Sequence, residues 1–90
     1  MAGGMIKLEI LSPEKRLFSG DVTCVRLPGS AAPFAVLYNH APLIAHLQKG
    51  VVSWEAPQGG GNIAIESGFA EVRDNTVSVC AETANIVTEK

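Results

Sequence analysis

The chain has 90 residues, a formal net charge of −2 at neutral pH and 47% hydrophobic residues. This length suffices for one domain, and a chain of this size buries only about 60–65% of the surface of its unfolded form, so its core is thin. No basic patch is visible, which argues against nucleic acid as a partner, and the longest apolar run, residues 31–38, is far too short to span a membrane.

The two ends of the chain are expected to lie outside the fold. Residues 1–5 are assigned to a leader, with Met5 as a candidate natural start, and they lack the basic and apolar segments of a signal peptide. Residues 6–84 are expected to form the domain and residues 85–90 a tail. A helix over 82–90 would be too short to be stable alone. We therefore expect a soluble, cytoplasmic protein.

The start of the domain predicts two short strands. Residues 6–10 alternate apolar and charged side chains, which gives one buried and one exposed face. The Ser-Pro pair at 12–13 begins a turn, because proline fixes its own dihedral angle and discourages helix in the residue before it. Residues 17–19 follow as a second strand, which ends at a Gly-Asp pair.

Two further strands with less regular patterns are predicted over 22–27 and 34–38. In the first of them the apolar residues change parity between Cys24 and Val25, which indicates a bulge or burial on both faces. The second lacks alternation and is therefore expected in the centre of a sheet. Residues 39–42 then turn the chain.

The second half of the chain continues the alternation of short apolar segments and turn residues. Residues 43–47 predict a strand or a single helical turn, which periodicity cannot distinguish over so few positions. Further strands are predicted over 51–55, 63–66, 69–73 and 76–81, separated by a glycine-rich hairpin tip at 57–62, a bend at Ser67-Gly68 and a tight turn at Asp74-Asn75. The whole pattern predicts an all-β domain, a flattened β sandwich or barrel of about nine to ten short strands without a helical domain.

Few residues could support catalysis. Dinucleotide and phosphate-loop motifs are missing, and the glycine triplet at 59–61 lies between strands rather than before a helix. Ser67 is not framed as a nucleophile elbow. Glu66 and Glu71 could in principle act as an acid–base pair, but carboxylates on the strands of a small domain are usually solvent-exposed. We expect a protein that is not an enzyme and takes no cofactor.

The two cysteines and two histidines raise the question of a metal site. Cys24 and Cys80 belong to no CxxC pair and are expected to be reduced, buried thiols. His40 and His46 would lie about 20 Å apart on an extended strand. A zinc site built from all four residues is possible in principle, because a sheet fold can bring distant residues together. It is only a secondary alternative, since these spacings match no zinc signature. We therefore expect no metal.

One apolar segment is a candidate partner surface. Six apolar residues surround the turn at 39–42, namely Leu37, Tyr38, Pro42, Leu43, Ile44 and Leu47. A small domain with a thin core and this much apolar content can keep part of it for an interface. The alternative interpretation, that all six belong to the core, agrees equally well with the composition.

Three segments of the chain share ordered landmarks with a known family. LEILSPEKRLFSGDVTCVRLPG at 8–29, NHAPLIAHLQKGVV at 39–52 and ESGFAEVRDNTVSVCAETA at 66–84 contain a Ser-Pro turn, a Phe-Ser-Gly, a Pro-Gly loop, a His-Ala-Pro turn and a Gly-Phe-x-Glu-Val hairpin. With these landmarks the chain resembles the amino-terminal β domain of the epsilon subunit of F-type ATP synthase.

The resemblance implies a non-catalytic β sandwich in the central stalk of a proton-driven rotary motor. The implied partners are the gamma subunit and the polar loops of the c-ring, so that rotation is coupled to ATP synthesis. Nucleic acid, a cofactor and insertion into the membrane are not implied. The expected location is peripheral, on the cytoplasmic side of the bacterial inner membrane. The alternative is a free-standing small ligand- or metal-binding β domain.

By position, the resemblance assigns two contact segments. Contacts to gamma are assigned to His40, Ala41, Pro42, Leu43 and Ile44, and the loop facing the c-ring to Ser30, Ala31, Ala32, Pro33 and Phe34. This loop lacks the acidic residues and glycines common in the family, so packing is expected to replace polar pairing with the ring. His46 is expected to be a surface residue.

Three departures from the family pattern matter. Asn39 stands where glycine is usual before His40, but asparagine tolerates the left-handed backbone, so the turn can form. Ser67 replaces the first glycine of a Gly-Gly pair. Typical epsilon subunits continue into a two-helix hairpin that in several members binds ATP or inhibits hydrolysis. If the natural chain ends at Lys90, only the coupling role is expected.

The assignment of His40 yields a first prediction. His40→Ala should weaken binding to the gamma subunit, because the side chain is expected to form hydrogen bonds in a turn at the interface. Titration calorimetry of the variant and the wild type against purified gamma measures this change. Unaltered affinity would contradict the assignment, as would metal bound by the wild type and lost by the variant.

Overall fold

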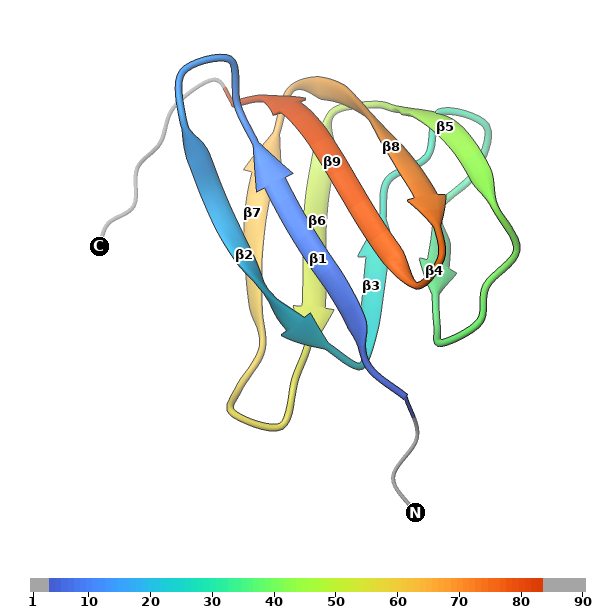
Figure 1. The fold of residues 1–90 in the computed structure, drawn as a ribbon. Helices are drawn as coiled ribbons and strands as arrows, with labels where there is room; N and C mark the ends of the chain where they lie inside the picture. The colour runs from blue at the N-terminus through green and yellow to red at the C-terminus, as the bar shows by residue number, and fades with distance from the viewer. Residues whose placement is uncertain (1–3, 84–90) are drawn as a thin grey trace.

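A computed structural model describes residues 4–83 as two packed β-sheets (Figure 1). Nine strands make up this region: β1 (Ile6–Leu11), β2 (Arg16–Val22), β3 (Cys24–Leu27), β4 (Phe34–Val36), β5 (Leu43–Leu47), β6 (Gly50–Glu55), β7 (Gly61–Ile65), β8 (Ser67–Arg73) and β9 (Thr76–Glu82). The prediction of an all-β sandwich is confirmed. Residues 4–83 contain no helix long and apolar enough to cross a membrane. The expectations for 1–3 and 84–90, the helical tail included, lie outside the described residues.

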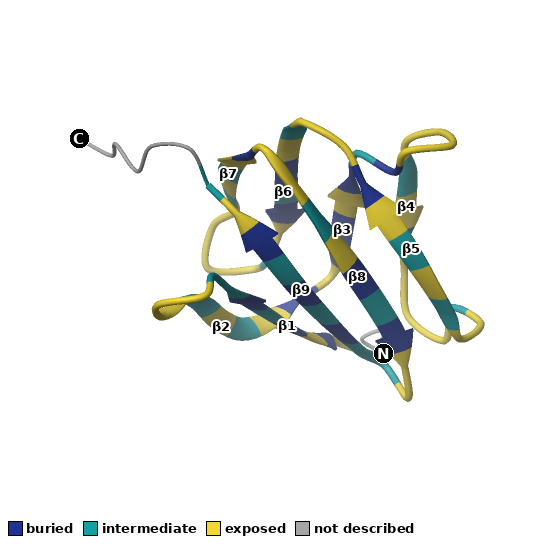
Figure 2. Ribbon diagram, turned by 90° about the horizontal axis from the view of Figure 1, so that it is seen from above, coloured by how far each residue is buried: buried dark blue, intermediate teal, exposed yellow. Residues whose placement is uncertain are grey.

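The five-stranded sheet has the order β2-β1-β9-β8-β5, and the four-stranded sheet behind it the order β4-β3-β6-β7 (Figure 1). Neighbouring strands run antiparallel except for β1 and β9, which pair in parallel over Lys7–Leu11 and Thr76–Cys80. The first and last strands therefore pair inside one sheet, and the seven strands between them in the sequence make up the rest of the two sheets. β4 and β5 are edge strands of the two sheets and lie on the same side of the sandwich (Figures 1 and 2).

The core between the sheets follows from the alternation of apolar residues. Buried and more exposed positions alternate along β1, β8 and β9 (Figure 2). The buried set combines both sheets and includes Ile6, Leu8, Ile10, Val25, Val52, Val72, Val77 and Val79. Phe18 packs against the core, and its ring centroid lies 4.4 Å from that of the buried Trp54. Each fully buried apolar side chain stabilises the fold by about 1.5–3 kcal/mol.

The single strand predicted over 22–27 is in fact two strands. Val22 ends β2 in the five-stranded sheet, and Cys24 begins β3 in the four-stranded sheet. Between them the N–H and the hydroxyl of Thr23 donate to the carbonyl of Glu55, at 2.8 and 3.1 Å. The change of parity marks the passage of the chain from one sheet to the other, because each sheet turns its own apolar face inward.

The expectation of a central strand over 34–38 was also wrong. β4 comprises only residues 34–36 and lies at the edge of its sheet. Leu37 and Tyr38 have left the strand and are 58% and 48% exposed. The missing alternation thus reflects the end of a short strand rather than burial on both faces. Residues 43–47, for which strand and helical turn were both open, form β5.

Local turn chemistry agrees with the sequence at two positions. Asp74 and Asn75 have φ of 52° and 57°, as in a type I′ hairpin turn, and connect β8 to β9 in two residues. Ser12 accepts hydrogen bonds from the N–H groups of Glu14 and Lys15, at 3.3 and 3.2 Å, which stabilises the predicted Ser-Pro turn.

The bend expected at Ser67-Gly68 lies one residue earlier, at Glu66, and Gly68 is part of β8. Gly68 pairs with Ala81 of β9 at a φ of 159°. A Cβ at this position would overlap the carbonyl oxygen of Cys80 and lie 2.9 Å from the Cα of Ala81. Glycine is therefore required by the close approach of the β9 backbone.

Gly68→Ala should therefore lower the free energy of unfolding by roughly 2–3 kcal/mol, because the added methyl group forces β8 and β9 apart. Urea unfolding measures the change. Gly20→Ala is the matched control, since the same methyl group would meet only the ring of Phe18, at 3.1 Å. We expect this control to remain within about 1 kcal/mol of the wild type. Equal midpoints for the two variants would show that the approach of β9 does not constrain Gly68.

Candidate functional site

The turn between β4 and β5 crosses from one sheet to the other along the side where both edge strands lie (Figure 1). The N–H of His40 donates to the carbonyl of Leu37 at 3.1 Å, and Asn39 has a φ of 67°. A positive φ at the third position is typical of a type II turn. Asparagine thus fills a position for which glycine is the more common choice, as expected from the sequence.

Apolar side chains are exposed on both sides of this turn. Ile44 is 73% exposed on the outer side of β5, and Leu37 and Tyr38 are the exposed residues that follow β4. Leu43 and Leu47 point the other way, and both pack in the core. The six-residue apolar segment is therefore divided between core and surface. Large exposed side chains grouped in this way are typical of an interaction surface.

The five residues assigned to gamma contact differ in their availability. Ala41, Pro42 and Ile44 are exposed, whereas His40 and Leu43 are half-buried. The Nδ1 atom of His40 lies 2.7 Å from the carbonyl oxygen of Ala41. Its ring therefore helps to shape the turn, and Ile44 offers the largest exposed apolar side chain of the five.

The loop assigned to the c-ring lies at the other end of β5. The N–H of Ser30 donates to the carbonyl of His46, and the N–H of Gln48 to that of Pro28, both at 2.9 Å. Since β5 has five residues, its two ends lie roughly 15 Å apart, with the β4–β5 turn at one end and the loop at the other. The two segments can therefore contact different partners at the same time.

Within this loop, Ser30, Ala31, Ala32 and Pro33 are exposed and carry no charge. Phe34 is half-buried and packs against the core, and its ring would lie 2.9 Å from a Cβ on Gly29. Phe34 therefore anchors the loop, and the exposed contact surface consists of the four residues before it.

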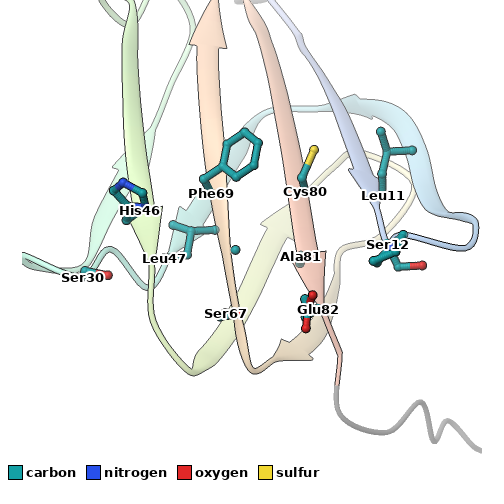
Figure 3. Close-up of a pocket in the computed structure, with 12 residues that line it drawn as sticks. Leu11, Ser12, Ser30, His46, Leu47, Ser67, Phe69, Cys80, Ala81 and Glu82 are labelled. Carbon is teal, nitrogen blue, oxygen red and sulfur yellow. The ribbon is translucent and has the colours of Figure 1, made fainter.

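An open depression of about 920 Å³ lies on the outer face of the five-stranded sheet (Figure 3). Four side chains line it from four different strands: Leu11 from β1, His46 from β5, Phe69 from β8 and Cys80 from β9. They form one row across the sheet, because His46 pairs with Phe69, Phe69 with Cys80, and Cys80 with Leu11.

This depression was not predicted from the sequence. Phe69 shares the parity of Glu71 and Arg73, and Leu11 that of Lys7 and Glu9, so both apolar residues occupy solvent-facing positions of their strands. An apolar residue at such a position is the signal that could have revealed it. The order of the strands, which brings the row together, was not available from periodicity.

The four residues considered for zinc are not brought together. Cys24 lies in the four-stranded sheet and Cys80 in the five-stranded sheet, while His46 lies on the exposed side of β5. Within residues 4–83, no group of three or more His, Cys, Asp or Glu side chains could hold a metal ion. Cys24 is buried as expected, whereas Cys80 is half-buried.

The ion pairs of the described residues are exposed and do not form a charged site. Arg26 and Glu55 bridge β3 and β6 at 2.9 Å, with side chains 56% and 62% exposed. The hydrogen bond that Arg26 donates to the carboxylate of Glu55 raises the pKa of the Arg26 guanidinium, which therefore stays charged. Glu66, one of the two carboxylates considered for catalysis, lies 4.0 Å from Lys49. Such pairs contribute little to stability.

Residues 5–87 match the family model described as the β-sandwich domain of the ATP synthase delta/epsilon chain. The chain is 43% identical over 77 residues to the ATP synthase epsilon chain of Leptospira borgpetersenii, a match that covers 86% of the chain and 61% of that relative. It is 40% identical over 78 residues to the ATP synthase epsilon chain of Pelotomaculum thermopropionicum, covering 87% of the chain and 58% of that relative. The chain thus spans about 60% of the length of these curated relatives.

Two solved structures share the fold. A chain of the Euglena gracilis mitochondrial ATP synthase, in an assembly of OSCP, F1 and c-ring, matches with a TM-score of 0.79 and 22% identity, over 86% of this chain and 50% of that chain. A chain of the Tetrahymena thermophila mitochondrial ATP synthase central stalk and c-ring matches with a TM-score of 0.73 and 14% identity, over 86% of this chain and 63% of that chain.

The different settings of the two cysteines yield a prediction for the depression. Cys80 should react with iodoacetamide at least about ten times faster than Cys24, because it faces the depression whereas Cys24 is 8% exposed. Mass spectrometry of the native protein at successive times measures both rates. Cys80→Ser should remove the fast phase and Cys24→Ser should preserve it. Equal rates for the two thiols would contradict the orientation of β9.

Proposed function

The chain belongs to the family of ATP synthase delta/epsilon chains, whose β-sandwich domain it contains, and from this premise we propose that it binds the gamma subunit and the c-ring in the central stalk. Epsilon chains are non-catalytic subunits of ATP synthase. In the proposed role, the domain couples rotation of the ring to ATP synthesis without a cofactor. It lies peripherally on the cytoplasmic side of the bacterial inner membrane, as part of the complex.

The observation that carries the gamma contact is the exposure of Leu37, Tyr38 and Ile44 around the β4–β5 turn. A stable interface of about 2,000 Å² takes roughly 1,000 Å² from each partner. The side of the sandwich that carries this turn also contains one edge strand of each sheet, β4 and β5, so a partner packed there covers exposed apolar groups and unpaired strand edges together. His40 supports this surface from within the turn.

The loop of residues 30–33 is the proposed c-ring contact. Its exposed residues are small and uncharged, so it would contact the ring by packing and through its backbone groups rather than through ion pairs. Its position at the far end of β5 from the β4–β5 turn allows one rigid sandwich to bind gamma and the ring simultaneously.

The alternative of a free-standing ligand-binding domain is less well supported. A binding pocket generally combines apolar walls with a few convergent polar groups. The depression is lined by polar as well as apolar residues, but the hydroxyl of Ser12 is already engaged in its own turn, and the row from Leu11 to His46 is largely apolar. Family membership also favours a role inside ATP synthase.

Ile44→Ser tests the proposed gamma surface. We expect the affinity for purified gamma to fall about 10- to 100-fold, since a central apolar contact is replaced by a small polar one. The fold should be unaffected, because Ile44 is 73% exposed. Calorimetric titration measures the dissociation constant.

Val51→Ser serves as the control, because Val51 is 52% exposed on β6 of the other sheet. The dissociation constant of Val51→Ser for gamma should stay within about threefold of the wild-type value. Ile44→Ser should bind the c-ring like the wild type, since Ile44 does not lie in the loop of residues 30–33. Equal losses for the two variants, or no loss for Ile44→Ser, would contradict the proposed surface.

A further inference from the structure

Two asparagines that are 36 positions apart in the sequence hold each other through two hydrogen bonds. The N–H of Asn39 donates to Oδ1 of Asn75 at 2.6 Å, and Nδ2 of Asn75 donates to Oδ1 of Asn39 at 3.2 Å. Both residues have a positive φ. We call this arrangement the asparagine pair. It joins the β4–β5 turn to the β8–β9 turn.

The anchor for this pair is the interior of the five-stranded sheet. The carbonyl of Asn75 accepts a hydrogen bond from the N–H of Lys7 at 2.9 Å, at the start of β1. Asn75 also lies in the two-residue turn that fixes β8 against β9. Because β1, β8 and β9 carry much of the buried core, Asn75 is held from two sides before it contacts Asn39.

The β4–β5 turn has little else to fix it. Among the described residues, the hydrogen bonds that join residues 37–41 to another segment are those of the asparagine pair. The remaining bond of the turn backbone, from His40 to Leu37, is internal to the turn. Leu37 and Tyr38 are exposed, so burial in the core does not hold them. The ring of Tyr38 lies against Gly4, before the start of β1, but this contact involves the side chain and leaves the backbone of Asn39 to the asparagine pair.

The side chain of Asn75 is not needed for the hairpin in which it lies. Asp-Gly is among the most favoured pairs for a type I′ turn, so glycine would suit this position at least as well as asparagine. What asparagine adds is a carboxamide directed at Asn39. The β8–β9 turn does not require the side chain of Asn75, but this side chain holds the distant β4–β5 turn. Its role therefore lies in the β4–β5 turn.

We propose that Asn75 is a positioning residue for the gamma-binding surface, which it serves by fixing the β4–β5 turn through Asn39. This inference rests on the proposed function. A partner binds only the competent conformation of a turn, so the apparent affinity falls in proportion to the fraction of molecules that hold it. Without the asparagine pair, Tyr38 and Ile44 are no longer fixed relative to each other, although neither is altered.

Three variants separate this role from the stability of the hairpin. Asn75→Gly removes the carboxamide and preserves a favourable turn pair. Asp74→Gly is the matched control, because it also introduces glycine in the same turn, one residue earlier, at a φ of 52°. The carboxylate that it removes lies 3.9 Å from the exposed Arg73 side chain. Asn75→Asp retains the oxygen that accepts the N–H of Asn39, so it should rescue most of the effect.

Each variant is measured twice, by the exchange of the Asn39 amide with water in NMR and by calorimetric titration with purified gamma. For Asn75→Gly we expect exchange about three- to tenfold faster and affinity about three- to tenfold weaker, as for the loss of two exposed hydrogen bonds. Asp74→Gly and Asn75→Asp should stay close to the wild type in both measurements.

The outcomes are distinguishable. Unchanged exchange at Asn39 in Asn75→Gly, or the same change in Asp74→Gly, would overturn the inference, since the carboxamide would then not fix the turn. Faster exchange with unchanged affinity for gamma would overturn it as well. If the wild type does not bind gamma, the proposed function fails and the role in gamma binding fails with it, whereas the exchange rates still decide whether Asn75 orders the turn.

Discussion

The parallel pairing of β1 with β9 is the constraint on which the rest of the sandwich depends. Ile6, Leu8 and Ile10 of β1, and Val77 and Val79 of β9, are completely buried along this pair. At about 1.5–3 kcal/mol for each side chain, the five contribute on the order of 10 kcal/mol, which is comparable with the net stability of a whole domain. The first and last strands of the domain are thereby joined in one sheet, and the strands between them in the sequence must complete the two sheets around this pair.

This central pair also determines what the surface can present. β5 and β4 are left as edges on one side, and the turn that joins them can bury only part of its apolar content. The same pair places the β8–β9 turn beside the start of β1, where Asn75 reaches the β4–β5 turn. A rigid core is thus connected to an exposed surface by specific contacts. This arrangement suits a subunit whose proposed role is to transmit rotation between two partners.

Predictions from the sequence were correct for features that depend on neighbouring residues. They failed for features that depend on contacts between distant parts of the chain. The Asp74-Asn75 turn and the alternation in β1 and β9 could be read directly, because positive φ and period two are local properties. The division of residues 22–27 into two strands could not be predicted in this way. A change of parity can mean a bulge, burial on both faces or a passage between sheets, and only the position of the second sheet distinguishes these explanations.

The same limit applies to the candidate sites. The apolar segment around His40 was visible in the sequence, but its division between the core and the surface depends on which edge of which sheet it occupies. The row formed by Leu11, His46, Phe69 and Cys80 requires the order of four strands, and the asparagine pair requires contact across 36 positions. Periodicity contains neither kind of information.

The central claim is that the edge formed by the β4–β5 turn and β5 faces the gamma subunit. Hydrogen–deuterium exchange of the chain, alone and in complex with purified gamma, tests it most directly. The account predicts that gamma slows exchange over residues 37–47 and leaves the β6–β7 hairpin tip at 57–60 unchanged. Protection confined to that hairpin tip, or a folded chain that shows no protection at saturating gamma, would contradict it.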